Sequence, residues 1–350
     1  MPAAPRVSVL MPLYNDERFV AAAIDSILGQ TFADFELLIV HDASTDRSRA
    51  IAASYPDPRI RLVDNDRNLG LTRSLNRGLA LVRGEYVARL DADDVSFPAR
   101  LAEQVAWLDA HPAVAALGVQ AVPIDVRGRR IRRVPLWNAH WRRPAGGLWM
   151  DWYRIFDTPF VHSGVMFRRA IVEELGGYDE RHPLEQDAEL WMRLGRSWQL
   201  ANLGEALVAF RFHRSSMTAD PSRPERQGYA ERRAAIVHAT LRELLRWEEV
   251  PPRWAALWVA ANDPSAKLPA ADVRELADAL DACAERFFTV YPEARRDRGI
   301  ARHRASMVAR LVDKSDARTA VSLYGRLLRL DPRTAALVLP RAAIRRVVHG

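Results

Sequence analysis

Three carboxylates within four residues, in the run Asp91-Ala92-Asp93-Asp94, are the feature of the sequence that most directly suggests chemistry. Carboxylates this close repel one another unless a cation or exposure to water compensates for their charge. Hard oxygen ligands of this kind suit Mg²⁺ or Mn²⁺, which often bridge a protein to substrate phosphates. A solvated acidic turn that caps the next helix would have the same sequence, so the run alone leaves both interpretations open.

Other polar side chains could take part in the same chemistry. Asp42 could accept a hydrogen bond from a nucleotide base or a ribose hydroxyl, or it could cap the helix that follows. Asp187 could act as a general base, or it could be one of several acids in the first turn of a helix. Arg211 and His213 would lie on the same side of a strand, where they suit a phosphate or a metal ion, or form a surface pair.

The first third of the chain alternates between strand and helix patterns. Short apolar runs rich in β-branched residues predict strands at 7–12, 35–41, 59–63 and 86–90. Apolar residues at helical spacing predict helices at 16–30, 71–82 and 98–110 and one that ends near residue 53. This alternation predicts a doubly wound α/β domain whose ligands bind beyond the carboxyl ends of the strands. Asn15, Asp42 and the acidic run each follow a predicted strand, so one crevice could collect all three.

The rest of the chain is predicted to divide near residue 220. Strands are expected at 113–122, 161–167 and 206–212, and helices at 169–175 and 184–196. Beyond about residue 224 only helical patterns remain, and the stretch 319–330 looks like a helical hairpin. We therefore expect an α/β domain over 1–220. A helical C-terminal region, basic at its end, would occupy 221–350.

Composition and charge narrow the class of protein. Of 350 residues, 49% are hydrophobic, which is enough for a sizeable core, and the single cysteine, Cys283, permits no intrachain disulfide. No signal peptide or membrane-spanning run is recognisable, so we expect a cytoplasmic location. The net charge is +7 and its basic excess lies in the last fifty residues. No nucleic-acid-binding motif accompanies it, so we expect no nucleic-acid partner, while peripheral contact with the inner face of the cell membrane stays open.

Together these pieces resemble a known family. Residues 5–218 resemble the inverting glycosyltransferases of family 2, which have the GT-A fold, and in particular those of bacterial polysaccharide synthesis. The resemblance rests on ordered segments: VSVLMPLYN (7–15), FELLIVHDASTDRS (35–48), NLGLTRSLNRGLALVRGEYVARLDADDVSFPARL (68–101), HSGVMFRRAIVEELGGYDE (162–180) and LEQDAELWMRL (184–194). The resemblance implies that 1–220 is a catalytic domain, with a donor half over about 1–110 and an acceptor half over about 111–220. The region beyond about residue 220 is not covered.

The resemblance implies a donor-binding set near the first two strands. Pro12, Tyr14 and Asn15 would lie near the nucleoside of a nucleotide sugar. Asp42 would contact its base or ribose. Asn68, which opens the family's long central signature, belongs to the same donor-binding set.

The resemblance also implies a metal site and a catalytic base. Asp91 and Asp93 would hold the donor ribose and a divalent metal, Mn²⁺ or Mg²⁺, with Asp93 favoured as the direct ligand. Arg211 and His213 correspond to an element that closes over the donor phosphates, and His213 would be a further metal ligand. Asp187 corresponds to the catalytic base.

Two departures from the family pattern affect single residues. His41 stands where many members have an acid before Asp42. Gln186 stands where many have a glutamate before the catalytic aspartate, and Glu185 is displaced by one position. The roles of Asp94 and Glu185 stay open.

The expected reaction is inverting, metal-dependent hexosyl transfer. The donor would be a UDP-, GDP- or dTDP-linked sugar and the acceptor a hydroxyl of a saccharide or lipid-linked saccharide, in cell-surface polysaccharide synthesis. The Arg- and Trp-rich stretch 127–152 would border the acceptor site, or consist of surface arginines and core tryptophans.

Two other functions stay open at this point. A non-catalytic, transferase-like binding module would keep the same fold. A nucleotidyltransferase is less favoured, because the loop after the first strand is Pro12-Leu13-Tyr14-Asn15 and not a glycine-rich basic loop. The sequence leaves the donor, the acceptor and the oligomeric state undecided.

Overall fold

The computed structural model describes residues 4–131, 145–213, 226–263 and 266–335. The chain divides into two compact units. The first comprises 1–147 and 158–227, and the second comprises 148–157 and 228–350.

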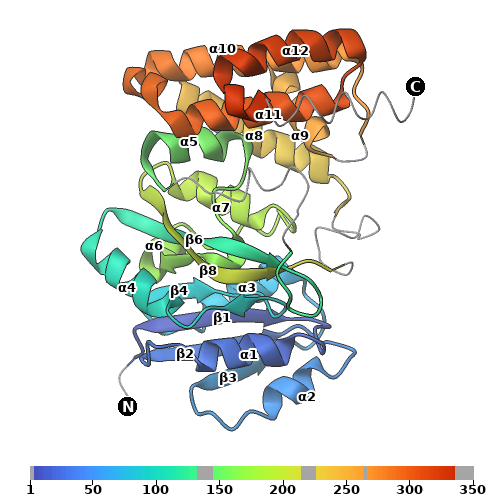
Figure 1. Cartoon of the computed structure of the whole chain (residues 1–350). Coiled ribbons are helices and arrows are strands. Elements are labelled where there is room, and N and C mark those ends of the chain that lie inside the picture. The colour runs from blue at the N-terminus through green and yellow to red at the C-terminus, as the bar shows by residue number, and fades with distance from the viewer. Residues whose placement is uncertain (1–3, 132–144, 214–225, 264–265, 336–350) are drawn as a thin grey trace. The chain divides into compact units, whose positions relative to one another are not determined.

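The first unit is built on an eight-stranded sheet in the order β3-β2-β1-β4-β7-β6-β8-β5 (Figure 1). The strands are β1 Val7–Leu13, β2 Phe35–His41, β3 Ile60–Asp64, β4 Tyr86–Arg89, β5 Val95–Ser96, β6 Val114–Ile124, β7 Met166–Arg168 and β8 Gln199–Arg211. Strands β3, β2, β1 and β4 are parallel, β7 is antiparallel to both β4 and β6, and β8 is parallel to β6. The predicted α/β class is confirmed, with a mixed second half to the sheet.

Helices connect the strands of the first unit. They are α1 Val20–Leu28, α2 Ser48–Ala53, α3 Leu71–Leu79, α4 Arg100–Ala110, α6 Arg169–Glu174 and α7 Gln186–Leu194, with a short 3-10 helix, η2, at His162–Gly164. The core lies where α1 and α4 meet the sheet, around fully buried Val9, Met11, Ile24 and Leu101. Strands β1 and β2 are apolar along nearly their whole length because helices cover both faces of the parallel half.

The register of β1 and β2 places their ends side by side. Val7 pairs with Phe35 and Leu13 with His41, so both strands end at the same edge of the sheet. Asn15, with φ 54°, then accepts from the backbone N–H of Thr45 at 2.8 Å and donates its own N–H to Ser44 Oγ at 3.1 Å. The two turns that carry predicted donor-binding residues are thereby held together.

The second unit is helical. It contains α5 Gly147–Phe156, α8 Tyr229–Leu245, α9 Pro252–Asn262, α10 Ala270–Val290, the 3-10 helix η4 Pro292–Arg296, α11 Arg298–Lys314 and α12 Ala317–Leu330. Its core includes the rings of Trp152, Phe156, Trp258 and Phe287, with the Trp152–Phe156 centroids 5.2 Å apart and the Trp152–Phe287 centroids 5.3 Å apart. Within the described ranges, no helix has the length and apolar character needed to cross a membrane.

The structure differs from the sequence-based expectation at several elements. Helix α5 packs in the helical unit, although its residues were expected in the acceptor half. The expected hairpin at 319–330 is the single helix α12, which packs against α11. The expected strand at 161–167 is divided into η2 and the short strand β7, while β8 begins seven residues earlier than the strand expected at 206–212.

Helix α5 also bears on the Arg- and Trp-rich stretch. Trp152 is fully buried in the helical core and Trp149 packs beside Gly299, so these two follow the core interpretation. Arg129 pairs with Asp125 at 2.8 Å. Arg127 and Arg130 are exposed, and the other members of the stretch lie outside the described residues: Arg132, Arg133, Trp137, Trp141, Arg142 and Arg143.

Candidate active site

Asp91 lies just beyond the carboxyl end of β4, where two neighbours fix its carboxylate. Its Oδ1 accepts from Arg89 Nη2 at 2.5 Å and its Oδ2 accepts from Ser163 Oγ at 2.6 Å. Burial by itself raises the pKa of Asp91, but the Arg89 guanidinium and the Ser163 hydroxyl outweigh burial and hold that pKa below its ordinary value. Asp91 is therefore an ionised and well-oriented acceptor.

Asp93, like Asp91, is partly exposed. Its side chain is 21% exposed, and its Oδ2 lies 2.7 Å from His213 Nε2. Its backbone carbonyl accepts from Arg211 Nε at 2.7 Å. The two residues that the sequence expects to close over the donor phosphates thus contact Asp93 directly.

Asp94 is buried and only half satisfied. Its Oδ1 accepts from the backbone N–H of Arg211 at 2.8 Å. Its Oδ2 is buried and has no hydrogen-bond partner in the part of the chain that the structure describes. Burial, and then the charges of Asp93 and Asp91, raise the pKa of Asp94 well above its ordinary value.

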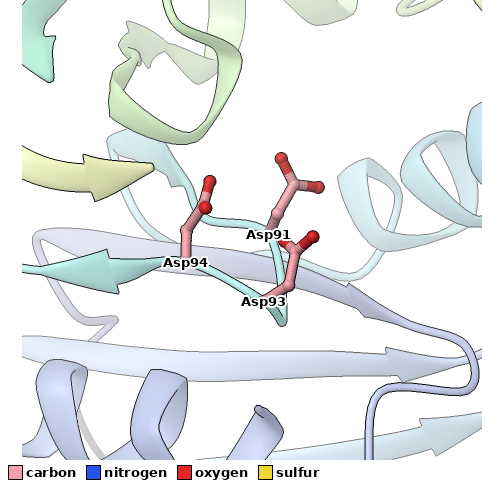
Figure 2. Close-up of side chains that lie close together, drawn as sticks. All are labelled: Asp91, Asp93 and Asp94. Carbon is pink, nitrogen blue, oxygen red and sulfur yellow. The ribbon is translucent and has the colours of Figure 1, made fainter. Parts of the chain in front are cut away.

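The three carboxylates fit a divalent cation. Figure 2 shows their side chains projecting from one loop, and one ligand atom from each lies within 4.8 Å of the others. An all-oxygen set with one buried oxygen lacking a partner is suited to a hard cation such as Mg²⁺ or Mn²⁺. Asp91 and Asp93, the predicted ligands, are two of the three and Asp94 is the third; metal binding by them stays a prediction. His213 contacts Asp93 but is not one of the three.

Arg211 is turned toward the protein backbone. Its Nε and Nη1 donate to the carbonyls of Asp93 and Asp125, at 2.7 and 3.0 Å, and its guanidinium lies 4.8 Å from the centroid of the Phe19 ring. In this structure Arg211 therefore holds the acidic run in place. The expected contact of Arg211 with donor phosphates stays a prediction. In that contact Nη2, the remaining nitrogen of the guanidinium, would be the donor.

Asp42 is also engaged within the protein. It is 3% exposed, and it accepts hydrogen bonds from Asn65 Nδ2 at 2.6 Å and from the backbone N–H groups of Leu69 and Gly70 at 2.8 and 2.9 Å. These bonds shape the loop before α3. The expected contact of Asp42 with a base or ribose stays a prediction, and the structure adds a positioning role.

The remaining donor-binding candidates lie at the surface of the same edge. Tyr14 is 39% exposed, Asn15 is exposed, and Pro12 is half-buried. Asn68 is exposed and lines a depression of about 280 Å³. The other lining residues are Leu69, Gly70, Leu71, Thr72, Arg73, Glu180 and Pro183.

Asp187 lies in the first turn of α7 and is half-buried. Its Oδ1 accepts from the backbone N–H of Ala188 at 2.7 Å, and Thr158 Oγ1 approaches its Oδ2 at 3.5 Å. Its neighbours Glu185 and Gln186 are buried beside it. The carboxylate of Asp187 thus keeps capacity to accept a further proton donor.

His162 and Tyr178 form a pair on which the charges of Asp187 and Asp91 both act, and sequence reasoning did not single them out. His162 Nε2 lies 3.0 Å from Tyr178 Oη. Burial and then the charge of Arg89 lower the pKa of His162 to about 4, against opposing contributions from Asp187 and Asp91. Both carboxylates therefore act on one imidazole. The sequence offered only a histidine ahead of a strand, which is a common and uninformative pattern.

The fold matches solved glycosyltransferases. Solved structures of S. aureus TarS 1–349 and of the mannosyltransferase PcManGT from Pyrobaculum calidifontis superpose with TM-scores of 0.56 and 0.52. The TarS match covers 95% of this chain and 90% of that one at 17% identity, and the PcManGT match covers 89% and 88% at 22% identity. At such identities the likeness concerns the fold, which is that of a GT-A glycosyltransferase.

Sequence comparison identifies the family. The model described as "Glycosyl transferase family 2" matches residues 8–176. EpsE of Bacillus subtilis, described as a glycosyltransferase, is 38% identical over 62% of this chain and 79% of its own length. The amylovoran biosynthesis glycosyltransferase AmsE of Erwinia amylovora is 31% identical over 58% of this chain and 75% of its own. The chain belongs to glycosyltransferase family 2.

Proposed function

We propose that this protein transfers a sugar from a nucleotide-sugar donor to a hydroxyl of a saccharide or lipid-linked saccharide, with inversion and with a divalent metal. The observation that carries the proposal is the cluster of Asp91, Asp93 and Asp94 just beyond the carboxyl end of β4, together with the charges of Asp91 and Asp187 that both act on His162. Support comes from the relative AmsE, named for amylovoran synthesis, and from PcManGT, whose structure was solved in complex with GDP-Man and Mn²⁺. Synthesis of a surface polysaccharide is the setting that these relatives suggest.

Each of these residues has a separate role in the proposed transfer reaction. Asp187 accepts the proton of the acceptor hydroxyl as its oxygen bonds to the anomeric carbon, while the bond from that carbon to the donor diphosphate breaks. Attack opposite the leaving group inverts the anomeric configuration. Asp91, fixed by Arg89 and Ser163, is placed to accept from a donor hydroxyl. A divalent cation held by Asp93 with Asp91 or Asp94 would offset negative charge on the departing nucleoside diphosphate.

Turnover of nucleotide sugars tests the proposal. Release of nucleoside diphosphate from UDP-, GDP- and dTDP-linked sugars is measured with Mn²⁺ and with saccharide acceptors. We expect Asp187→Asn and Asp93→Asn each to lower the rate by about 100-fold or more, because each removes a group that acts in the transition state. Asp34→Asn, an exposed carboxylate before the amino end of β2, is the matched control.

The outcomes separate the alternatives. If Asp187→Asn kept a near-normal rate while Asp93→Asn lost it, Asp187 would not be the base. If the wild type turned over none of these donors, a non-catalytic binding module would become the better account.

A lipid-linked acceptor would place the enzyme at the inner face of the cell membrane. The basic residues Arg341, Arg345 and Arg346, which favoured this idea, lie outside the described residues. Helices α11 and α12 contribute buried Leu311, Leu323 and Leu327 to the helical core, so removing 301–350 would damage the fold. Sedimentation with anionic vesicles should therefore compare the full chain with one that ends at residue 335, and equal binding of both would count against a role for the tail.

A further inference from the structure

His162 occupies a fixed position beside the proposed reaction centre. It opens the 3-10 helix η2 and directly precedes Ser163, whose hydroxyl donates to Asp91. Its ring meets those of Tyr178 and Trp191 edge-on, with centroids 5.7 and 6.2 Å away. Tyr178 and Trp191 are both buried, so the imidazole has little freedom to rotate away.

The hydrogen bond to Tyr178 determines which ring nitrogen of His162 carries the proton. The Tyr178 side chain is 2% exposed, and the partner of its hydroxyl among the described residues is His162 Nε2, at 3.0 Å. A buried hydroxyl with one partner must donate to it, because its proton would otherwise be unpaired. Nε2 is therefore the acceptor, and the neutral ring carries its proton on Nδ1.

Tyr178 is itself held from two sides. Asn76 on α3 accepts from the Tyr178 N–H at 2.9 Å and donates to its carbonyl at 2.8 Å. Arg193 on α7 donates to the carbonyl of Gly177 at 2.7 Å, and Gly177, at φ 73°, lets the turn pass close to Asn76. These hydrogen bonds fix the backbone on both sides of Tyr178. A surface ring does not need to be fixed in this way, but a side chain whose hydroxyl must be positioned accurately does.

The charged groups near His162 indicate which kind of hydrogen-bond acceptor its Nδ1–H group could have. The charges that act on the ring are Arg89 on β4, Asp91 after it, and Asp187 on α7. Within the described residues the ring makes no hydrogen bond other than that to Tyr178, and the side chain is half-buried, so part of it remains reachable. A carboxylate only accepts and this N–H only donates. A hydroxyl can do both, accepting from His162 while it donates to a neighbouring carboxylate.

We propose that His162 is a substrate-contacting residue whose Nδ1–H donates to a sugar hydroxyl oxygen between Asp187 and Asp91. The inference rests on the proposed transfer reaction. The hydroxyl belongs either to the acceptor, where it would donate to Asp187, or to the donor sugar, where it would donate to Asp91. In both cases His162 orients a hydroxyl and moves no proton itself.

The tautomer is tested without any turnover. Long-range ¹H–¹⁵N spectra of histidine-labelled protein report the protonated ring nitrogen, and the signal missing from His162→Asn assigns His162. We expect a neutral ring with the proton on Nδ1, and a shift of the Nδ1 signal when UDP-GlcNAc, GDP-Man or an octyl glycoside is added. Protonation on Nε2, or no shift with any of these probes, would overturn the proposal.

Steady-state kinetics then distinguish the two possible sources of the hydroxyl, which are the acceptor and the donor sugar. We expect His162→Ala to lower kcat/KM by about tenfold or more, and His162→Asn, whose amide N–H can replace Nδ1–H, to recover part of the loss. A rise in KM for the octyl glycoside identifies the acceptor hydroxyl, and a rise in KM for the nucleotide sugar identifies the donor hydroxyl. Equal losses in both variants, matched by equal losses in thermal stability, would show a purely structural role. A wild type with no turnover would count against the proposed function, while the tautomer result would stand.

Discussion

The chemistry of the site depends on a few side chains whose partners lie far away in the sequence. Arg89 is completely buried, yet its guanidinium is placed to neutralise Asp91, and Ser163 completes the arrangement. Asp94 receives the backbone N–H of Arg211, which is 117 residues away. The sequence could predict which residues carry charge. It could not predict these pairings, because they exist only once β4, η2 and β8 are placed side by side.

The state of His162 makes a prediction at this scale. Burial lowers its folded pKa to about 4 from an ordinary 6.5, so between these values the unfolded chain binds a proton that the folded chain does not. The neutral ring therefore favours folding above about pH 6.5, and this stability is lost as the pH falls toward 4. The free energy of unfolding is measured by urea denaturation at about pH 7 and at about pH 5. Its decrease between these two pH values should be about 1–2 kcal/mol smaller in His162→Asn than in the wild type, after allowance for the partly exposed ring.

The control for this prediction is another histidine. His111→Asn, at the exposed end of α4, is measured beside His162→Asn and shows what the loss of a different histidine does to the pH dependence. An identical pH dependence in His162→Asn and the wild type would contradict the assignment of a half-buried, neutral ring.

At the scale of elements, local patterns predicted the parallel half of the sheet well. Strand β2 has the predicted bounds, because a continuous apolar run between turn residues has few alternatives. Strand β5 has only two residues and is defined by its pairing with β8, so no local pattern marks it. Strand β8 shifts register against β6, which breaks the alternation that would have revealed its first half.

Gly84 shows how tightly the parallel half is assembled. A Cβ at this position would lie 2.5 Å from the backbone nitrogen of Ser8 and 2.8 Å from the carbonyl carbon of Val7. Backbone atoms of β1 cannot move aside cheaply, so Gly84→Ala should lower the free energy of unfolding by about 1–3 kcal/mol in urea denaturation. Gly204→Ala on β8 is the matched control, since nothing lies within 4 Å of its Cβ, and it should change stability by less than about 1 kcal/mol. Equal effects of both substitutions would contradict this packing.

At the scale of the whole molecule, the two compact units are interleaved along the chain. Helix α5 has an apolar sequence on nearly all sides. Such a pattern predicts that the helix is buried, but it does not predict which of the two cores the helix joins. The structure assigns residues 148–157 to the helical unit. The sequence suggested a single boundary near residue 220, whereas the compact units separate after residue 227 and also exchange residues 148–157.

This assignment predicts how truncated chains behave. A chain of residues 1–227 would keep α5 without its partners and expose Trp152, Ile155 and Phe156, each at most 3% exposed in the full chain. We expect this fragment to aggregate in size-exclusion chromatography and to bind a hydrophobic dye. The same fragment with a Gly/Ser linker in place of 148–157 should be more soluble. Equal solubility of the two fragments would contradict the assignment of α5.

The central claim is that the acidic run binds a nucleotide sugar together with a divalent metal. The direct test is the thermal stability of the full chain with UDP-, GDP- and dTDP-linked sugars, with Mn²⁺ or with a chelator. We predict that at least one donor raises Tm by about 5–10 °C, at roughly 100 times its Kd, only when Mn²⁺ is present. Asp93→Asn should abolish the rise and Asp34→Asn should keep it. No rise with any donor, or the same rise with chelator or in Asp93→Asn, would contradict the account.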